Sequence, residues 1–465
     1  MPTITSLGVG SGLDASSIIS SLMAVERKPI TQLQKAQSEM KTQLSSFGKL
    51  QSLMSGLRDA SNALVDPNLW KGTVAKSADD ASVVASSSGG AAAGSYAVSV
   101  QSLASGQTVA SKAFASSSAT VGSGTLTIEL GSWTGSPASG FTPKSGASPV
   151  AIEIGPDDTS LSSIRDKING ANAGVTATII NDAQGARLSI RSAATGEENA
   201  FRITAAETAD DGVAATGLSA LAYSATSPSE MSRSQTAANA RATINGIQLS
   251  SASNKLENVA DGLTLNLKKV TSGDVDVSVA SDGDAVKKKI EDFVKAFNDL
   301  ASNIRETTKY DAGTKVAGPL QGDRSVIGLQ SQLRAVLNEA SSASGAFGRL
   351  SDIGIAMKSD GTLETKSSKL DTALGNLPEL QKLFANDGAD NASSGFARRF
   401  KKLADQMLGS EGMFETRNAG LNGSISRNGK QQDAMSARLA QMEARLTKQY
   451  QQLDLQMAKL NKLGN

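Results

Sequence analysis

Residues 14–27 read DASSIISSLMAVER, and residues 435–460 read MSARLAQMEARLTKQYQQLDLQMAKL. In both stretches apolar residues recur every three or four positions, which indicates one apolar face of a helix. The steps in the second stretch are 4, 3, 4, 4, 3, 4 and 3 residues, so a heptad is kept except at one extra four-residue step. We therefore predict a coiled-coil helix with a stutter. Its face consists of Met435, Leu439, Met442, Leu446, Tyr450, Leu453, Met457 and Leu460.

The N-terminal stretch predicts two consecutive helices. Asp14 suits the N-cap of the first, and Pro29 stands where one helix can end or the next begin. The second pattern continues to about Leu64. An ordinary core role is the alternative for any single amphipathic helix, but two long ones at opposite termini favour pairing with each other or with copies of themselves. The apolar positions expected to serve as assembly contacts are Leu13, Ile18, Ile19, Leu22, Leu33, Met40 and Leu44.

The composition excludes several classes of function. With 46 basic and 45 acidic residues the formal net charge is +1, so we expect no nucleic-acid partner. There is no cysteine and no histidine, which excludes disulfides, thiol chemistry, the usual zinc sites and histidine acid–base catalysis. The first seven residues lack a secretory signal pattern and no run of 18 apolar residues occurs, so we expect no Sec cleavage and no membrane insertion.

The middle of the chain changes from helical to alternating periodicity at Thr73 and returns to helical periodicity near Ser281. Strand patterns occur at 82–86, 95–100, 125–130, 150–154, 175–180, 187–191, 242–247, 262–267 and 275–279. Ser160 can cap a short helix between these strands, and Asp323 can cap another beyond them. Residues 115–119 and 224–239 have the small, polar composition of connectors.

The fold class that we predict is an α+β multidomain protein with terminal coiled-coil legs, a helical domain and nested β-rich head domains. A length of 465 residues suggests about three domains. The expected ranges are 1–42 for leg helices that pair with 411–465, 43–72 and 281–410 for the helical domain, 73–115 and 235–280 for one β-rich head domain, and 116–234 for an inserted α+β head domain.

No catalytic constellation emerges from the residues, and we expect no enzyme and no cofactor. The pairs Asp79-Asp80, Asp157-Asp158, Glu197-Glu198 and Asp210-Asp211 lie in polar, turn-like stretches and lack calcium-loop spacing. Residues 8–12 read GVGSG, which does not match the nucleotide-binding patterns. Residues 287–289 are three lysines, which we interpret as a solvated helix face, with an interface as the alternative.

The N-terminal stretch also resembles a known signature. Ser11-Gly12-Leu13-Asp14, followed by Ile18-Ile19 and Glu26-Arg27, is similar to the start of the bacterial flagellar filament cap family, the FliD or hook-associated protein 2 family. Gly94-Ser95-Tyr96 and Ile244-Asn245-Gly246 resemble sheet motifs of flagellar axial proteins. The resemblance spans nearly the whole chain and is weakest from residue 115 to residue 239.

This resemblance implies a structural cap at the distal tip of the filament, which promotes flagellin polymerisation, prevents the loss of exported flagellin and is needed for motility. It implies export through the flagellar secretion channel and a homo-oligomeric ring, a pentamer or hexamer. Flagellin, hook–filament junction proteins and an export chaperone are the implied partners. The alternatives are another hook-associated axial protein or an adhesin displayed at the tip.

Overall fold

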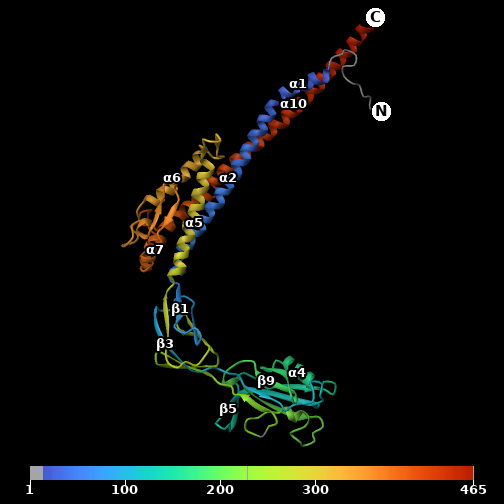
Figure 1. Cartoon of the computed structure of the whole chain (residues 1–465), viewed down its shortest axis with the longest axis vertical. Helices are drawn as coiled ribbons and strands as arrows, with labels where there is room; N and C mark the ends of the chain where they lie inside the picture. Colours follow the sequence, from blue (N-terminus) through green and yellow to red (C-terminus); the bar gives the residue numbers. More distant parts are fainter. Residues whose placement is uncertain (1–13, 228, 464–465) are drawn as a thin grey trace. The chain divides into compact units, whose positions relative to one another are not determined.

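The computed structural model of the chain describes residues 14–227 and 229–463. They fold into two compact units, a helical one that joins the described residues up to Trp70 to those from Gly283 onward and a β-rich one formed by Lys71–Asp282 (Figure 1). The predicted α+β class with helical terminal parts is confirmed. No helix among the described residues is long and apolar enough to cross a membrane.

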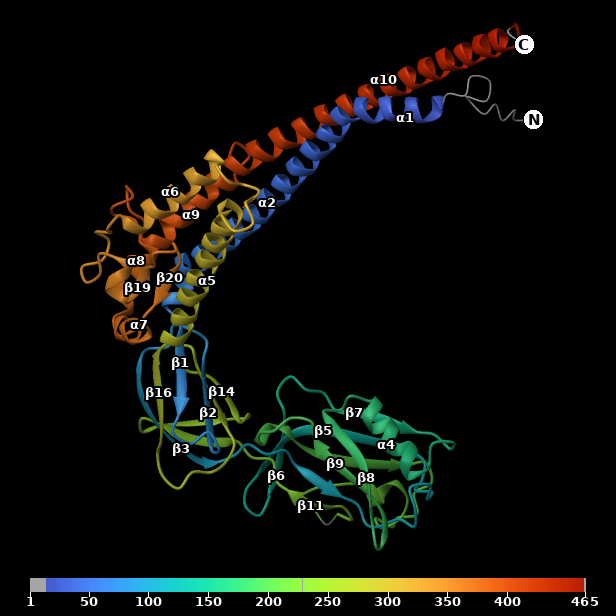
Figure 2. The same ribbon diagram turned by 45° about the horizontal axis from the view of Figure 1, so that its top comes forward.

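The helical unit is built from segments that lie at the two ends of the sequence. Figure 2 shows α1 and α2 running alongside α10. Its helices are α1 (Ala15–Glu26), α2 (Lys28–Val65), α3 (Pro67–Trp70), α5 (Gly283–Thr308), α6 (Arg324–Asn338), α7 (Ser367–Leu374), α8 (Leu377–Ala385), α9 (Phe396–Leu408) and α10 (Met413–Leu463). Its short hairpins are β17 (Tyr310–Asp311) with β18 (Val316–Ala317), and β19 (Ile355–Met357) with β20 (Leu363–Thr365).

Aromatic side chains form the centre of the helical core. Phe293 of α5 meets Phe400 of α9 edge to face with ring centroids 5.3 Å apart, and meets Phe384 of α8 at 6.4 Å. All three rings are fully buried. Geometry of this kind adds to the stabilisation that burial of apolar area already gives. The core continues along α2 through Phe47, so the helices from both ends of the sequence share one interior.

The β-rich unit contains a first group of strands that occurs on both sides of an insertion. One sheet has the order β1-β16-β3-β12-β13, and a second has the order β14-β15-β2. The strands are β1 (Thr73–Ser77), β2 (Val83–Ser87), β3 (Gly94–Ser102), β12 (Ala240–Ile244), β13 (Ile247–Ser251), β14 (Lys255–Ala260), β15 (Leu263–Leu267) and β16 (Val275–Ser281). Branched and small aliphatic side chains such as Val98, Val277 and Leu265 fill their core.

The insertion forms two further sheets and the helix α4, with a core of its own. The orders are β10-β5-β6, with β7 also pairing with β5, and β11-β4-β9-β8. The elements are β4 (Thr108–Ala110), β5 (Gly124–Thr134), β6 (Gly140–Pro143), β7 (Val150–Ile154), α4 (Leu161–Gly170), β8 (Val175–Asp182), β9 (Gly185–Ser192), β10 (Ala200–Glu207) and β11 (Ser232–Gln235). Ser160 caps α4 by accepting the N–H of Ser163, as predicted.

Two expectations about the β-rich unit need correction. The stretch 242–247, expected as one strand, turns back on itself at Asn245-Gly246, because both residues have the positive φ angles, 49° and 82°, of a two-residue hairpin turn. The stretch 224–239, expected as a linker, contains β11, which pairs with β4. Strand β4 lies before residue 116, the expected start of the insertion, and yet belongs to a sheet of the insertion. Both β4 and β11 are short and lack apolar alternation, so they can be recognised as strands only from the strands with which they pair.

Candidate assembly surface of the terminal helices

We call α1 together with the parts of α2 and α10 beside it the leg. A local cap sets the start of its first helix, α1. The Asp14 carboxylate accepts the Ser17 N–H at 3.0 Å and the Ser16 hydroxyl at 2.7 Å. These bonds, that from the Ser17 N–H above all, hold the pKa of Asp14 below its usual value. Helix α1 ends at Glu26 with Arg27 as its C-cap, and Pro29 stands in the first turn of α2, where no backbone N–H is needed. The chain therefore begins two consecutive helices where the sequence predicted them.

Helix α1 packs against α10 through a small apolar group, which we call the terminal cluster. Ile19 and Met23 of α1 and Leu439 of α10 are its buried members. Ile30, Met435, Met442, Leu446 and Tyr450 pack against them and are partly buried. Beside this cluster, a guanidinium nitrogen of Arg27 lies 3.2 Å from a carboxylate oxygen of Glu443. An exposed ion pair of this kind contributes little stability.

Polar side chains interrupt the apolar face of α10 closer to the helical core. Asn428 is buried and precedes Met435 by seven residues, so it lies on the same face. Its side-chain oxygen accepts a hydrogen bond from Gln432 Nε2 at 2.6 Å. Nearer the core, Asn418 Nδ2 donates to Gln51 Oε1 of α2 at 3.1 Å. Sequence reasoning missed these positions because it followed apolar residues alone, although the seven-residue spacing from Met435 was there to find Asn428.

Helix α1 also carries a second apolar face, which stays open. Ile18, Leu22 and Val25 are spaced by four and three residues and are 37%, 45% and 58% exposed. At the far end of α10, Leu453 and Leu460 are exposed as well. A helix that is apolar on more than one side is usually buried on more than one side, and a large exposed apolar surface marks an interaction site. We call the exposed apolar side chains of Ile18, Leu22 and Val25 the outer face.

The expected assembly residues thus have different surroundings. Leu13 and the stretch 8–12 lie outside the described residues. Ile19 and Leu439 are buried in the terminal cluster, with Met435, Met442, Leu446 and Tyr450 around them. Leu33, Met40 and Met457 are partly buried, and Leu44 packs against the core of the helical unit. Ile18, Leu22, Leu453 and Leu460 are exposed.

A groove runs between α2 and α10 beside the terminal cluster. It has a volume of about 660 Å³, and most of its lining is apolar. Leu33 and Ala36 of α2 and Ala434 and Met435 of α10 form its floor and walls. The two alanines keep the groove open because their side chains do not fill it. Together with the outer face, it gives the leg a side on which another helix can pack.

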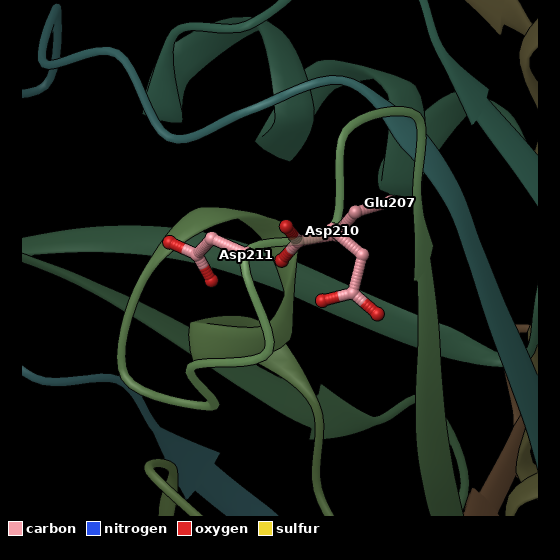
Figure 3. Close-up of side chains that lie close together, drawn as sticks. All are labelled: Glu207, Asp210 and Asp211. Carbon is pink, nitrogen blue, oxygen red and sulfur yellow. The ribbon is translucent and has the colours of Figure 1, made fainter.

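Among the described residues, one of the acidic pairs singled out in the sequence, Asp210-Asp211, lies close to a third carboxylate, that of Glu207. Glu207 is the last residue of β10 and the two aspartates lie on the loop that follows it, with oxygen atoms of all three within 4.8 Å of one another (Figure 3). The Asp210 carboxylate accepts the Gly212 N–H, and that of Asp211 accepts the Val213 N–H, each at 2.8 Å. Glu207 accepts the backbone N–H of Ser219, in the short 3-10 helix Gly217–Leu221, at 2.6 Å. These hydrogen bonds explain the cluster as a means of ordering the loop.

Three family models match the chain. A model described as flagellar hook-associated protein 2 N-terminus matches residues 11–107, and one described as flagellar hook-associated protein 2 C-terminus matches residues 237–462. The region between them contains a match to a flagellin hook IN motif at residues 150–194. The first model covers Asp14, α1 and α2, and the second covers most of α10.

Relatives match along nearly the full length. The chain is 33% identical over 475 residues to flagellar hook-associated protein 2 of Escherichia coli strain K12, with 99% of this chain and 96% of the relative covered. It is 30% identical to the B-type flagellar hook-associated protein 2 of Pseudomonas aeruginosa, with 98% and 95% covered. The crystal structure of the D1-D2-D3 domains of the flagellar cap protein FliD from Escherichia coli is similar with a TM-score of 0.60 and 30% identity, and covers 81% of this chain and 99% of that one.

Proposed function

This chain belongs to the flagellar hook-associated protein 2 family, and we propose on that basis that it is the structural cap at the distal tip of a bacterial flagellar filament. The observation that carries the proposal is similarity over 99% of the chain to a protein of that name, with the fold of a flagellar cap protein over most of its length. The cap promotes the polymerisation of flagellin and prevents the loss of exported flagellin monomers. Its role is structural and not enzymatic.

We propose that the leg mediates assembly. The terminal cluster holds α1 and α10 together within one chain, while the outer face remains available. The partners that we infer are further copies of the chain in a pentameric or hexameric ring, flagellin, hook–filament junction proteins and an export chaperone. We infer that export proceeds through the flagellar apparatus, and the absence of cysteine is compatible with passage of an unfolded chain.

The test is a deletion strain complemented with variants of this chain. Deletion is expected to leave cells with hooks but few filaments and with flagellin monomer in the medium, and normal filaments in that strain would contradict the proposal. The variant Leu22→Asp places a charge on the outer face and is expected to restore few filaments. Ser20→Asp, which adds the same charge at an exposed position on the side of α1 away from Ile18 and Leu22, is the matched control and is expected to restore them.

Two other roles are separated by location and by phenotype. A junction protein would be found at the hook end of the filament, so labelling the growing end distinguishes it from a cap. An adhesin would be recognised by retained motility with lost binding to host cells. The names of the relatives favour the cap over both.

A further inference from the structure

Strand β7 has one paired edge and one open edge. It pairs with β5, and β5 pairs on its other side with β10. In β10, Ile203 exchanges both backbone hydrogen bonds with Tyr223, at 3.0 and 2.9 Å, so its backbone groups face away from β5. Its partner Ile128 therefore directs its own N–H and C=O toward Val150 of β7.

The alternation along an antiparallel pair then decides which groups of β7 are free. Because Val150 faces β5, Ile152 and Ile154 do so too, and Ala151 and Glu153 carry their N–H and C=O on the opposite edge. In the described part of the chain no other segment hydrogen-bonds to these two residues. An edge of this kind can accept a further strand.

Helix α4 borders this open edge without covering it. The groove between α4 and β7 has a volume of about 860 Å³ and includes Ala151, Glu153, Ser163 and Asp166 in its lining. A strand added to β7 would lie in this groove with the helix along its other side. Helix and strand are seen together in Figure 2.

Helix α4 also borders the edge of β8, and there it satisfies both backbone groups of one residue, Ala177. Asn169 of α4 donates its Nδ2 to the Ala177 carbonyl of β8 at 2.9 Å and accepts the Ala177 N–H at 2.8 Å. A side-chain amide therefore takes the place of a neighbouring strand at β8. No residue of α4 does this at β7 among the described residues, so the two edges differ in what they leave available.

The charge of the groove indicates the kind of side chain that would enter it. Glu153 is exposed and forms no ion pair within the described chain. Asp158 and Asp166 also line the groove, but Asp158 pairs with Lys167 at 2.9 Å and Asp166 pairs with Arg165 at 2.7 Å. Glu153 therefore supplies the uncompensated negative charge of the described lining, and a basic residue is complementary to it.

We propose that the β7 edge and α4 form a docking groove for an extended peptide segment of a partner protein, which adds as a strand beside β7 and places a lysine or arginine near Glu153. The backbone groups of Ala151 and Glu153 supply affinity for any extended chain. The carboxylate of Glu153 selects the basic side chain. This interaction is separate from the contacts proposed for the terminal helices.

The test uses the full chain and a labelled, capped octapeptide of alternating lysine and valine. Binding is followed by fluorescence anisotropy, and the site is followed by hydrogen exchange of the β7 amides. We expect saturable binding that slows exchange in β7 and not in β13. An octapeptide of alternating glutamate and valine is expected to bind at least about tenfold more weakly.

Two variants and a control identify the residues responsible. Ala151→Pro removes an outward N–H while leaving the ladder to β5 in place, and edge strands tolerate proline, so binding should be lost with the fold retained. Glu153→Lys should weaken binding of the basic peptide at least about tenfold. Asp157→Lys, a charge reversal at an exposed residue outside the groove, should change it less than about twofold.

Four results would overturn the proposal. One is equal binding of the acidic and basic peptides, and another is unchanged affinity in Glu153→Lys. The third is protection of the β7 amides that rises with protein concentration in the absence of peptide, since that would assign the edge to a second copy of the chain. A lack of binding at millimolar peptide would also contradict it.

Discussion

The side-chain amide of Asn298 on α5 pairs with both backbone groups of Leu363 on β20. Its Nδ2 donates to the Leu363 carbonyl at 2.8 Å, and its Oδ1 accepts the Leu363 N–H at 2.6 Å. An asparagine thus continues a two-stranded hairpin by one position and ties it to α5, a helix of the central core. A hairpin of two short strands is marginally stable alone, so this contact fixes it in place.

Replacing Asn298 with aspartate should destabilise the helical unit. The carboxylate keeps the acceptor but loses the donor, and it places negative charge against the Leu363 carbonyl. We expect the free energy of unfolding to fall by about 1–3 kcal/mol. Urea denaturation at neutral pH measures it, and Asn62→Asp, at an exposed position of α2, is the control that should change little. Equal effects of the two substitutions would contradict the role of the paired hydrogen bonds.

Acid should weaken the helical unit partly through Glu379. Hydrogen bonds from Lys382, and further ones from Ser344 and the Gly345 N–H, lower the pKa of this carboxyl from 4.5 to about 2. The unfolded chain then binds a proton in a range where the folded chain does not, so this contribution is present above pH 4.5 and is lost as the pH falls toward 2.

The variant Glu379→Gln tests that assignment. Its urea midpoint should lie below that of the parent at pH 6, and the difference should shrink between pH 4.5 and pH 2. Glu411→Gln alters an exposed glutamate and provides the comparison. A difference for Glu379→Gln that stays constant over the whole pH range would show that protonation of Glu379 is not involved.

We expect the buried Asn428 to fix the register of α10 against α2, and to lower the free energy of unfolding relative to an apolar residue at the same position. A Cβ at its neighbour Gly429 would lie 3.7 Å from Gln37 Nε2 of α2, so this part of α10 faces α2. Asn428→Leu should raise the free energy of unfolding by about 1 kcal/mol and permit more than one association state. Thermal melting and sedimentation velocity measure the two effects. Asn422→Leu, at an exposed site on α10, should produce neither, and a destabilised Asn428→Leu would contradict the prediction.

Removing residues 435–465 should abolish assembly and leave folding intact. The buried core of the helical unit reaches along α10 only to Leu421, and the two cores of the β-rich unit contain no residue of α10. We expect a cooperative thermal transition in the truncated protein and no filament growth in cells. In the intact chain, amide exchange should be slow in the sheets and fast near Leu460. An aggregated or unfolded product would show that the terminal cluster is needed for folding.

Some features of the chain followed from local physics. The heptad face of α10, the Asp14 and Ser160 caps and the proline in the first turn of α2 depend on residues within a few positions of one another. Helix periodicity and capping are local, so a sequence without its fold still displays them.

What the sequence left open is which apolar residue meets which neighbour. Ile18 and Ile19 are adjacent and identical in type, and both were expected to be assembly contacts, yet Ile19 lies in the terminal cluster while Ile18 is exposed. A periodic pattern shows that a face exists but does not say what lies opposite. That depends on contacts across more than 400 residues of sequence, such as Ile19 with Leu439.

The sequence alone determined the α+β class, the helical ends, the β-rich middle and the resemblance to the family. Tertiary structure alone decided the pairing of β4 with β11 and the open edge of β7. It also decided which strand residues receive backbone hydrogen bonds from the side-chain amides of Asn169 and Asn298. The physical reason is that both strand pairing and the hydrogen bonding of backbone groups at a sheet edge depend on residues far apart in the sequence. A short strand such as β11 has no apolar alternation of its own, and only the partner that accepts its hydrogen bonds makes it a strand.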